Sequence, residues 1–239
     1  DPAKTALWMA SSAISCNLGL FPRHIKTLLD AYGQGMEKVG VYTGSLSFSD
    51  ISLKLPLNTY LAFMVGGLVR RIGCKIRPYE RISGTTDRAI KEGMDVLVEA
   101  FSGNLPKEKA VAEVVSRFEA IETIRDASVL RSDRQRPKVA IFGDLYARDN
   151  EVINQDLIHF IEDNGGEVLT TPYSDYLKMV SRPYFRKWLI EGHYLSVISS
   201  GALMATLKMK EKTYYKYFER ILNEPEQEFN DSARDILAH

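Results

Sequence analysis

Side chains that can bind ligands gather in one polar segment near the middle of the chain. An apolar run at residues 139–142 ends at Gly143, and residues 144–150 then carry acidic, basic, aromatic and amide groups, including Tyr146 and Arg148. The planar guanidinium of Arg148 could bind a carboxylate or a phosphate, or it could form an ion pair with a neighbouring carboxylate. Tyr146 and Arg148 are therefore the best candidates for a binding pocket, and no residue is assigned a catalytic role.

The polar segment lies inside a strand–loop–helix–strand pattern. A helical periodicity runs from about residue 152 to 162, Gly165 and Gly166 follow, and a second apolar run begins at Val168. This is the spacing of a βαβ crossover. Open α/β sheets bind ligands at the carboxyl ends of their strands, where this segment is expected to lie. Asn154 could line the same pocket or support the start of the helix.

Helical periodicity dominates the rest of the chain. We expect helices at about 21–32, 57–72, 87–101, 111–121, 173–191, 193–222 and 224–239, and a short strand at 39–42. The aromatic and methionine side chains within 173–222 are typical of a core or a buried interface. One βαβ pattern among so many helices supplies too few strands for a complete doubly wound sheet. The expected fold class is therefore α/β, with Rossmann-like parallel sheet elements and many helices, in an excised portion of a larger multi-domain protein.

The charged segment 131–137, which ends in a proline, is the expected domain boundary. It divides a first α/β and helical portion, 1–134, from a second portion, 135–239, which holds the start of a Rossmann-like βαβ unit and trailing helices. The chain begins at Asp1 without a methionine, as a processed chain or an excised piece would.

Composition limits the function classes. Acidic and basic residues number 31 each, so the formal net charge is zero, which argues against a dedicated nucleic-acid binder. The longest apolar stretch, 55–68, is shorter than the roughly 20 residues that span a bilayer, so no membrane association is expected. Two cysteines cannot form a disulfide framework, and the first residues lack the cationic and apolar pattern of a signal peptide, so none is expected. We expect a soluble, cytoplasmic protein.

Common catalytic and cofactor motifs are missing. The sequence has no Walker loop, no GxGxxG fingerprint after the 139–142 run and no GxSxG elbow. Its four histidines are scattered without metal-ligand spacing. The residues alone therefore predict a ligand position on an α/β fold without naming a reaction.

Three segments in order carry a family resemblance. They are Arg77-Pro-Tyr-Glu80, Gly84-Thr-Thr-Asp87 and residues 137–150, followed by Asn154 and by Gly-Gly-Glu-Val at 165–168. This order resembles the 2-hydroxyacyl-CoA dehydratase/benzoyl-CoA reductase-like family, in the branch related to CoA-substrate-specific enzyme activases. In that branch Arg-Pro-Tyr-Glu precedes Gly-Glu-Ile-Tyr-Val-Arg, which corresponds to Gly143-Asp-Leu-Tyr-Ala-Arg148. The resemblance covers about residues 10–180.

The resemblance implies Rossmann-like domains with an iron–sulfur cluster, of the [4Fe–4S] kind, held by cysteines between them. It also implies electron delivery from an ATP-dependent activator protein. Cys16 occupies the place of a family cysteine and is the candidate cluster ligand, although its neighbours Ser15 and Asn17 depart from the family pattern. A cluster needs roughly three or four cysteine ligands, so the set in this chain is incomplete. Cys74 is expected to be a buried small hydrophobe.

Two functions from different classes follow. The first is a component of a dehydratase-like iron–sulfur protein in ATP-driven, low-potential electron transfer of anaerobic metabolism, with CoA thioesters as one substrate class. The alternative is a non-catalytic α/β binding or scaffolding module that binds no cluster by itself. In this alternative the aromatic helices at 173–222 form an interface, and one expected assembly is a homo-oligomer. A small-molecule or nucleotide pocket at 143–150 is a third reading, weakened by the missing glycine fingerprint. Arg77 and Glu80 could line a pocket or pin a helix end, and both readings stay open.

Overall fold

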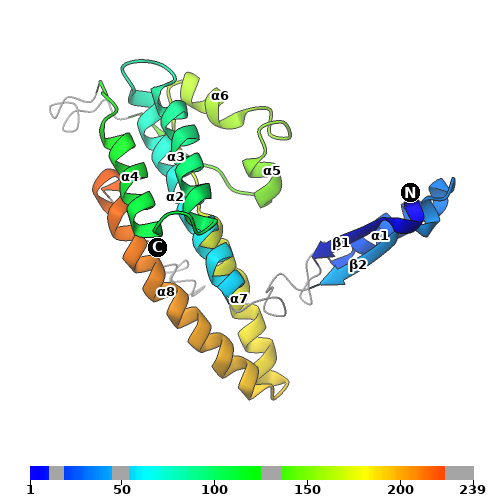
Figure 1. The fold of residues 1–239 in the computed structure, drawn as a ribbon. Coiled ribbons are helices and arrows are strands. Elements are labelled where there is room, and N and C mark those ends of the chain that lie inside the picture. Colours follow the sequence, from blue (N-terminus) through cyan, green and yellow to red (C-terminus); the bar gives the residue numbers. More distant parts are fainter. Residues whose placement is uncertain (11–18, 45–53, 125–135, 224–239) are drawn as a thin grey trace.

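The structure is a computed structural model, and it describes residues 1–10, 19–44, 54–124 and 136–223. The described residues are mostly helical and contain two separate two-stranded parallel sheets, so the fold is of the mixed α/β class (Figure 1). The expected boundary at 134/135 and the expected helix at 224–239 lie outside the described residues.

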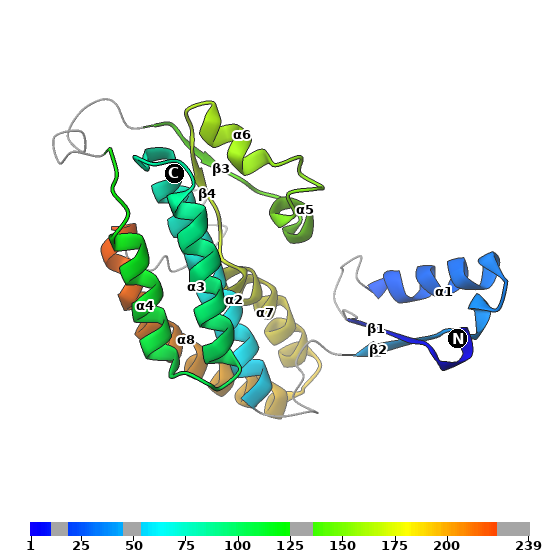
Figure 2. The same ribbon diagram turned by 45° about the horizontal axis from the view of Figure 1, so that its top comes forward.

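The first sheet belongs to a small N-terminal unit. Strand β1 (Ala6–Ala10) pairs in parallel with β2 (Gly40–Gly44), in a register that sets Ala6 beside Gly40, and helix α1 (Phe21–Tyr32) lies between them in the sequence. Two short 3-10 helices, η1 (Pro2–Lys4) and η3 (Met36–Lys38), complete the unit. Figures 1 and 2 both show it apart from the other helices. The α1 and β2 predictions are confirmed, whereas β1 was not predicted.

Five helices form the main body. They are α2 (Lys54–Ile76), α3 (Thr85–Phe101), α4 (Lys107–Glu119), α7 (Tyr173–Ile190) and α8 (Tyr194–Leu222). Helix α2 is apolar around most of its circumference, and it packs against α3, α7 and α8. Leu68, Ile72, Phe118 and Phe218 are among the side chains of the resulting core. All five helices were predicted, with boundaries that differ by a few residues.

The second sheet packs on this body. Strand β3 (Lys138–Ala140) pairs in parallel with β4 (Glu167–Leu169), and β4 lies against α2. Two short helices, α5 (Leu145–Asp149) and α6 (Leu157–Asp163), connect the strands. The strand–helix–strand order expected at 137–172 is therefore confirmed, and Figure 2 shows the two strands side by side.

Two details of this crossover differ from the prediction. Residues 144–150 hold the short helix α5 instead of a loop, because Asp144 Oδ1 accepts the Ala147 N–H at the start of that turn. Residues 151–155 form turns instead of helix, because the Asn150 side chain accepts the N–H groups of Val152 and Ile153. Helix α6 consequently starts only at Leu157.

None of the helices in the described ranges is both long enough and apolar enough to cross a membrane.

Candidate functional site

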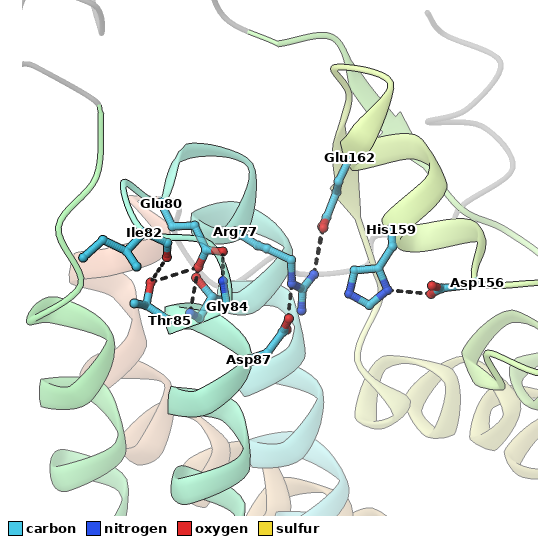
Figure 3. Close-up of polar contacts among 10 residues, drawn as sticks. Arg77, Glu80, Ile82, Gly84, Thr85, Asp87, Asp156, His159 and Glu162 are labelled. Carbon is cyan, nitrogen blue, oxygen red and sulfur yellow. Dashed lines mark hydrogen bonds and ion pairs between the residues drawn. The ribbon is translucent and has the colours of Figure 1, made fainter.

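The Arg-Pro-Tyr segment lies where the helical body meets the crossover. It forms the 3-10 helix η4 (Arg77–Tyr79), directly after α2. Arg77 Nη1 donates to both oxygens of Glu162, at 3.0 and 2.9 Å, and Arg77 Nε donates to Asp87 Oδ1 at 2.8 Å (Figure 3). One guanidinium thus joins η4 to α6 and to α3.

The Arg77–Glu162 pair is buried. Only 4% of the Glu162 side chain is exposed, and burial raises the pKa of this carboxyl group although Arg77 acts in the opposite direction. Burial lowers the pKa of Arg77, but the hydrogen bonds and charge of Glu162 outweigh it and leave the pKa above its usual value. A pair of this kind is costly to break, because either partner alone would be an uncompensated buried charge.

Glu80 caps the start of α3. Its Oε1 accepts the Gly84 N–H at 2.6 Å, and its Oε2 accepts the Thr86 N–H at 2.7 Å and the Thr85 hydroxyl at 3.0 Å (Figure 3). Burial opposes ionisation, but these hydrogen bonds outweigh it, and the pKa of Glu80 lies below its usual value. The geometry therefore favours the expectation that Glu80 pins a helix end, through hydrogen bonds to free N–H groups.

Tyr79 attaches the same segment to the sheet. Its hydroxyl donates to Glu167 Oε2 at 2.8 Å, and the Arg136 guanidinium lies 5.5 Å from the centre of its ring. Glu167 is the first residue of β4 and is buried. Arg77 and Tyr79 thus contact α6 and β4, which follow them by more than 80 residues in the sequence.

A second charged cluster lies beyond the carboxyl ends of β3 and β4. Arg148 is buried and donates from Nε and Nη2 to Asp149, at 2.8 and 2.9 Å, and from Nη2 to the carbonyl of Thr171, which follows β4. Arg70 Nη1 of α2 lies 2.7 Å from Asp149 Oδ1. The pairing of Arg148 with Asp149 is the ion pair that was one of the two alternatives expected for Arg148. Sequence reasoning missed the contribution of Arg70, which lies on a helix whose contact with α5 no local pattern predicts.

Tyr173 lies near the second cluster. Burial raises the pKa of its hydroxyl, and the negative charge of Asp149 raises it further. Its ring stacks on that of Phe63, with 5.4 Å between the centroids. The second cluster therefore brings Arg70, Arg148 and Asp149 close to a stacked aromatic pair.

The remaining predicted residues are placed as follows. Asn154 donates from its amide to the Arg148 carbonyl at 2.7 Å and accepts the Leu157 N–H at 3.2 Å, so it supports the start of α6. Tyr146 lies in α5, and its side chain, like all of Cys16, lies outside the described residues. Arg77 and Glu80 adjoin each other, but Arg148 belongs to the separate second cluster.

The described residues do not fit an iron–sulfur cluster. Cys74 is buried, and burial raises its pKa to about 11, so it is a neutral thiol at physiological pH. Within the ranges that the structure describes, no three histidine, cysteine or carboxylate side chains are grouped closely enough to hold a metal ion. His159 instead pairs with Asp156, at 2.5 Å.

Another buried network joins α2, α7 and α8. Glu211 accepts from the Tyr60 hydroxyl at 3.0 Å and from Lys178 Nζ at 2.9 Å, and Lys178 also lies 3.0 Å from Asp175. Sequence reasoning missed this network. The available signal was the position of Glu211 on the apolar stripe of α8, between Leu207 and Tyr215.

A separate hollow lies away from both clusters. It measures about 420 Å³ and is formed by the turn between α3 and α4 together with Tyr214 of α8. The Tyr214 hydroxyl donates to Glu108 at its edge, at 2.8 Å. None of the predicted site residues lines it.

Comparisons of the chain with protein-family models, with curated proteins and with solved structures give no match.

Proposed function

We propose that the chain is part of a 2-hydroxyacyl-CoA dehydratase-like protein that works in ATP-driven, low-potential electron transfer in the cytoplasm, with CoA thioesters as the substrate class. One observation carries the proposal. Two segments that hold the family resemblance, 77–80 and 165–168, lie far apart in the sequence, yet they contact each other: the Tyr79 hydroxyl binds Glu167. Segments of one functional unit are expected to meet in this way.

The crossover supports the Rossmann-like part of the proposal. Its two strands are parallel, and Arg148 and Asp149 follow β3 at the edge where α/β sheets bind ligands. Arg148 is bound to Asp149 and to a carbonyl, so its role in the proposal is to position the loop. Arg70 is the more exposed cation, with 28% of its side chain accessible, and it is the candidate for contact with an anionic group such as a phosphate of CoA.

The cluster in this proposal takes its ligands from outside the described residues. Cys16 is the ligand that this chain would supply, and the other cysteines would come from another chain or from another part of a longer protein. An ATP-dependent activator protein would deliver the electrons. Arg77, Glu80 and Tyr79 hold α3, α6 and β4 in place, and no chemical step is assigned to them.

Iron content tests the proposal. The longer protein or the complex that supplies the remaining cysteines would be purified anaerobically, and its iron and acid-labile sulfide would be measured. We expect iron when this chain is wild type and its loss when the chain carries Cys16→Ser. Cys74→Ala is the matched control and should retain iron, since a buried neutral thiol is no ligand. Absence of iron from the wild-type protein or complex that holds all the cysteines, or equal iron with Cys16→Ser, would overturn the cluster assignment.

A second candidate function, a binding or scaffolding module, is favoured by a different observation. Apolar side chains are exposed around the turn between α7 and α8, among them Ile190, Leu195 and Ile198. Exposed apolar patches of this kind mark interaction sites in soluble proteins. This candidate requires no cluster.

A further inference from the structure

The first half of α8 is an exposed helix without charges. From Tyr194 to Leu207 the sequence has no acidic or basic side chain, although Leu195 is 84% exposed and Ile198 68%. A solvent-facing helix normally carries charged residues on its outer face. Figure 1 shows the α7–α8 turn lying beyond the ends of α3 and α4, so nothing from those helices covers this surface. We therefore expect this surface to pack against another molecule.

Gly201 marks the centre of the surface. It lies in the interior of α8 and is exposed, and a Cβ atom added there would meet nothing within 4 Å. A glycine inside a helix costs about 1 kcal/mol relative to alanine. Neither a turn nor a neighbour within the described chain explains it, whereas close approach of another helix does.

One face of α8 runs through Gly201. Residues spaced by three, four or seven positions share a helix face, so Tyr194, Ile198, Ala205 and Lys208 lie with Gly201. All of them are exposed. The face therefore has a glycine centre, an aromatic ring seven positions before it and a lysine seven positions after it.

This order is complementary to itself when two copies run antiparallel. With a two-fold axis at Gly201, Tyr194 of one copy lies beside Lys208 of the other, twice, where a lysine can pack over an aromatic ring. Ile198 meets the second copy near Ala205. Parallel packing would instead set lysine against lysine.

We propose that this face of α8 is a homodimer interface, in which two copies cross antiparallel at Gly201. The inference rests on the second candidate function and names its partner as a second copy of this chain. An uncharged surface flanked by self-complementary groups favours a copy of itself over a partner of specific charge. The iron test is independent of it, since no cysteine lies in α8.

Gly201→Leu tests the interface. The full wild-type chain is expected to dimerise in a concentration series followed by sedimentation velocity and light scattering. Leucine at the crossing would clash with its own symmetry mate and weaken association by about tenfold or more. It would not disturb the monomer, because the added side chain points into open space and leucine favours helix. At concentrations where both proteins are monomeric, helix content and the thermal midpoint should therefore not fall.

Thr213→Leu, an exposed change on the same helix away from this face, is the matched control and should remain dimeric. Gly201→Cys gives a second measurement in a chain whose Cys16 and Cys74 are replaced. Only a residue near a two-fold axis meets its own copy, so mild oxidation should yield a 201–201 disulfide dimer, whereas Thr213→Cys should not. A wild-type chain that is monomeric throughout the series, or a Gly201→Leu variant that dimerises equally well, overturns the proposal. Monomers that bind lipid vesicles or a different protein overturn it as well.

Discussion

Glu80 shows how one carboxylate can organise the start of a helix. Its three hydrogen bonds satisfy two N–H groups and one hydroxyl at the beginning of α3. Replacing it with alanine leaves these donors to water, and we expect Glu80→Ala to lower the free energy of unfolding by about 1–3 kcal/mol. Urea denaturation at neutral pH would measure the loss.

The effect of Glu80 should also depend on pH. Its folded-state pKa lies below its unfolded-state value, which is about 4.3. The stabilisation is therefore fully present above the unfolded pKa and is lost as the pH falls through the folded pKa. The difference between wild type and Glu80→Ala should shrink between neutral pH and about pH 3. An equal difference at both ends of that range would show that the carboxylate charge is not what stabilises α3.

At the scale of single residues, local partners were predictable and distant ones were not. The pairing of Arg148 with Asp149 was one of two alternatives for Arg148, because adjacent opposite charges are visible in a sequence. The partner of Arg77 was not predictable, since Glu162 follows it by 85 positions and meets it only through the packing of α6. One of the two open predictions for Glu80 was that it pins a helix end by an ion pair. The structure shows that it holds the start of α3 by hydrogen bonds instead.

At the scale of elements, two adjacent glycines in α2 are expected to behave oppositely. A Cβ atom on Gly67 would lie 2.9 Å from the backbone Cα of Pro172, whereas one on Gly66 would meet nothing within 4 Å. Gly67 therefore lets α2 approach the chain between β4 and α7. We expect Gly67→Ala to destabilise the protein by about 1–3 kcal/mol through overpacking.

Gly66→Ala is the matched control for this change. It adds the same atoms one position away and should stabilise the protein, by up to about 1 kcal/mol, because alanine favours helix more than glycine. Thermal unfolding of both variants and of wild type tests this directly: the midpoint should fall for Gly67→Ala and rise for Gly66→Ala. Equal shifts for both would mean that the close approach at Pro172 does not limit the packing.

Long periodic segments were predictable as elements, and short segments with distant partners were not. The five helices of the body each repeat an apolar pattern over three or more turns, which predicts helix independently of its neighbours. Strand β1 escaped prediction because five residues, Ala6–Ala10, carry little pattern, and their partner β2 lies 34 positions away. The helix expected from residue 152 failed because Asn150 binds the following N–H groups with its side chain.

At the scale of the whole molecule, the helices on either side of residues 125–135 are interleaved. Tyr60 of α2 binds Glu211 of α8, Glu108 of α4 binds Tyr214, and Lys75 Nζ donates to the Leu222 carbonyl. A composition shift can indicate a linker, but it cannot show whether the flanking segments pack together. Whether they pack together depends on long-range contacts. One example is Glu211, on the apolar stripe of α8, whose partners Tyr60 and Lys178 cannot be identified from the sequence.

The N-terminal unit and the helical body should unfold separately. In the unit, Pro22 and Val39 are the only buried residues among 1–9 and 19–44, where burial is described, whereas the body buries a continuous core across α2, α3, α4 and α8. A two-stranded sheet with one helix is marginally stable by itself. We expect the unit to unfold at a lower urea concentration than the body.

The two tryptophans allow this to be measured. Trp8 lies in β1 and is 53% exposed, and Trp188 lies in α7 beside Tyr184 and Phe185. In Trp188→Phe, fluorescence reports on the N-terminal unit, while far-ultraviolet circular dichroism reports mainly on the helices of the body. The fluorescence midpoint should come first, and Trp8→Phe should give a fluorescence midpoint that follows the dichroism more closely. Coincident midpoints in Trp188→Phe would contradict this prediction, because they would mean that the unit and the body unfold as one cooperative structure.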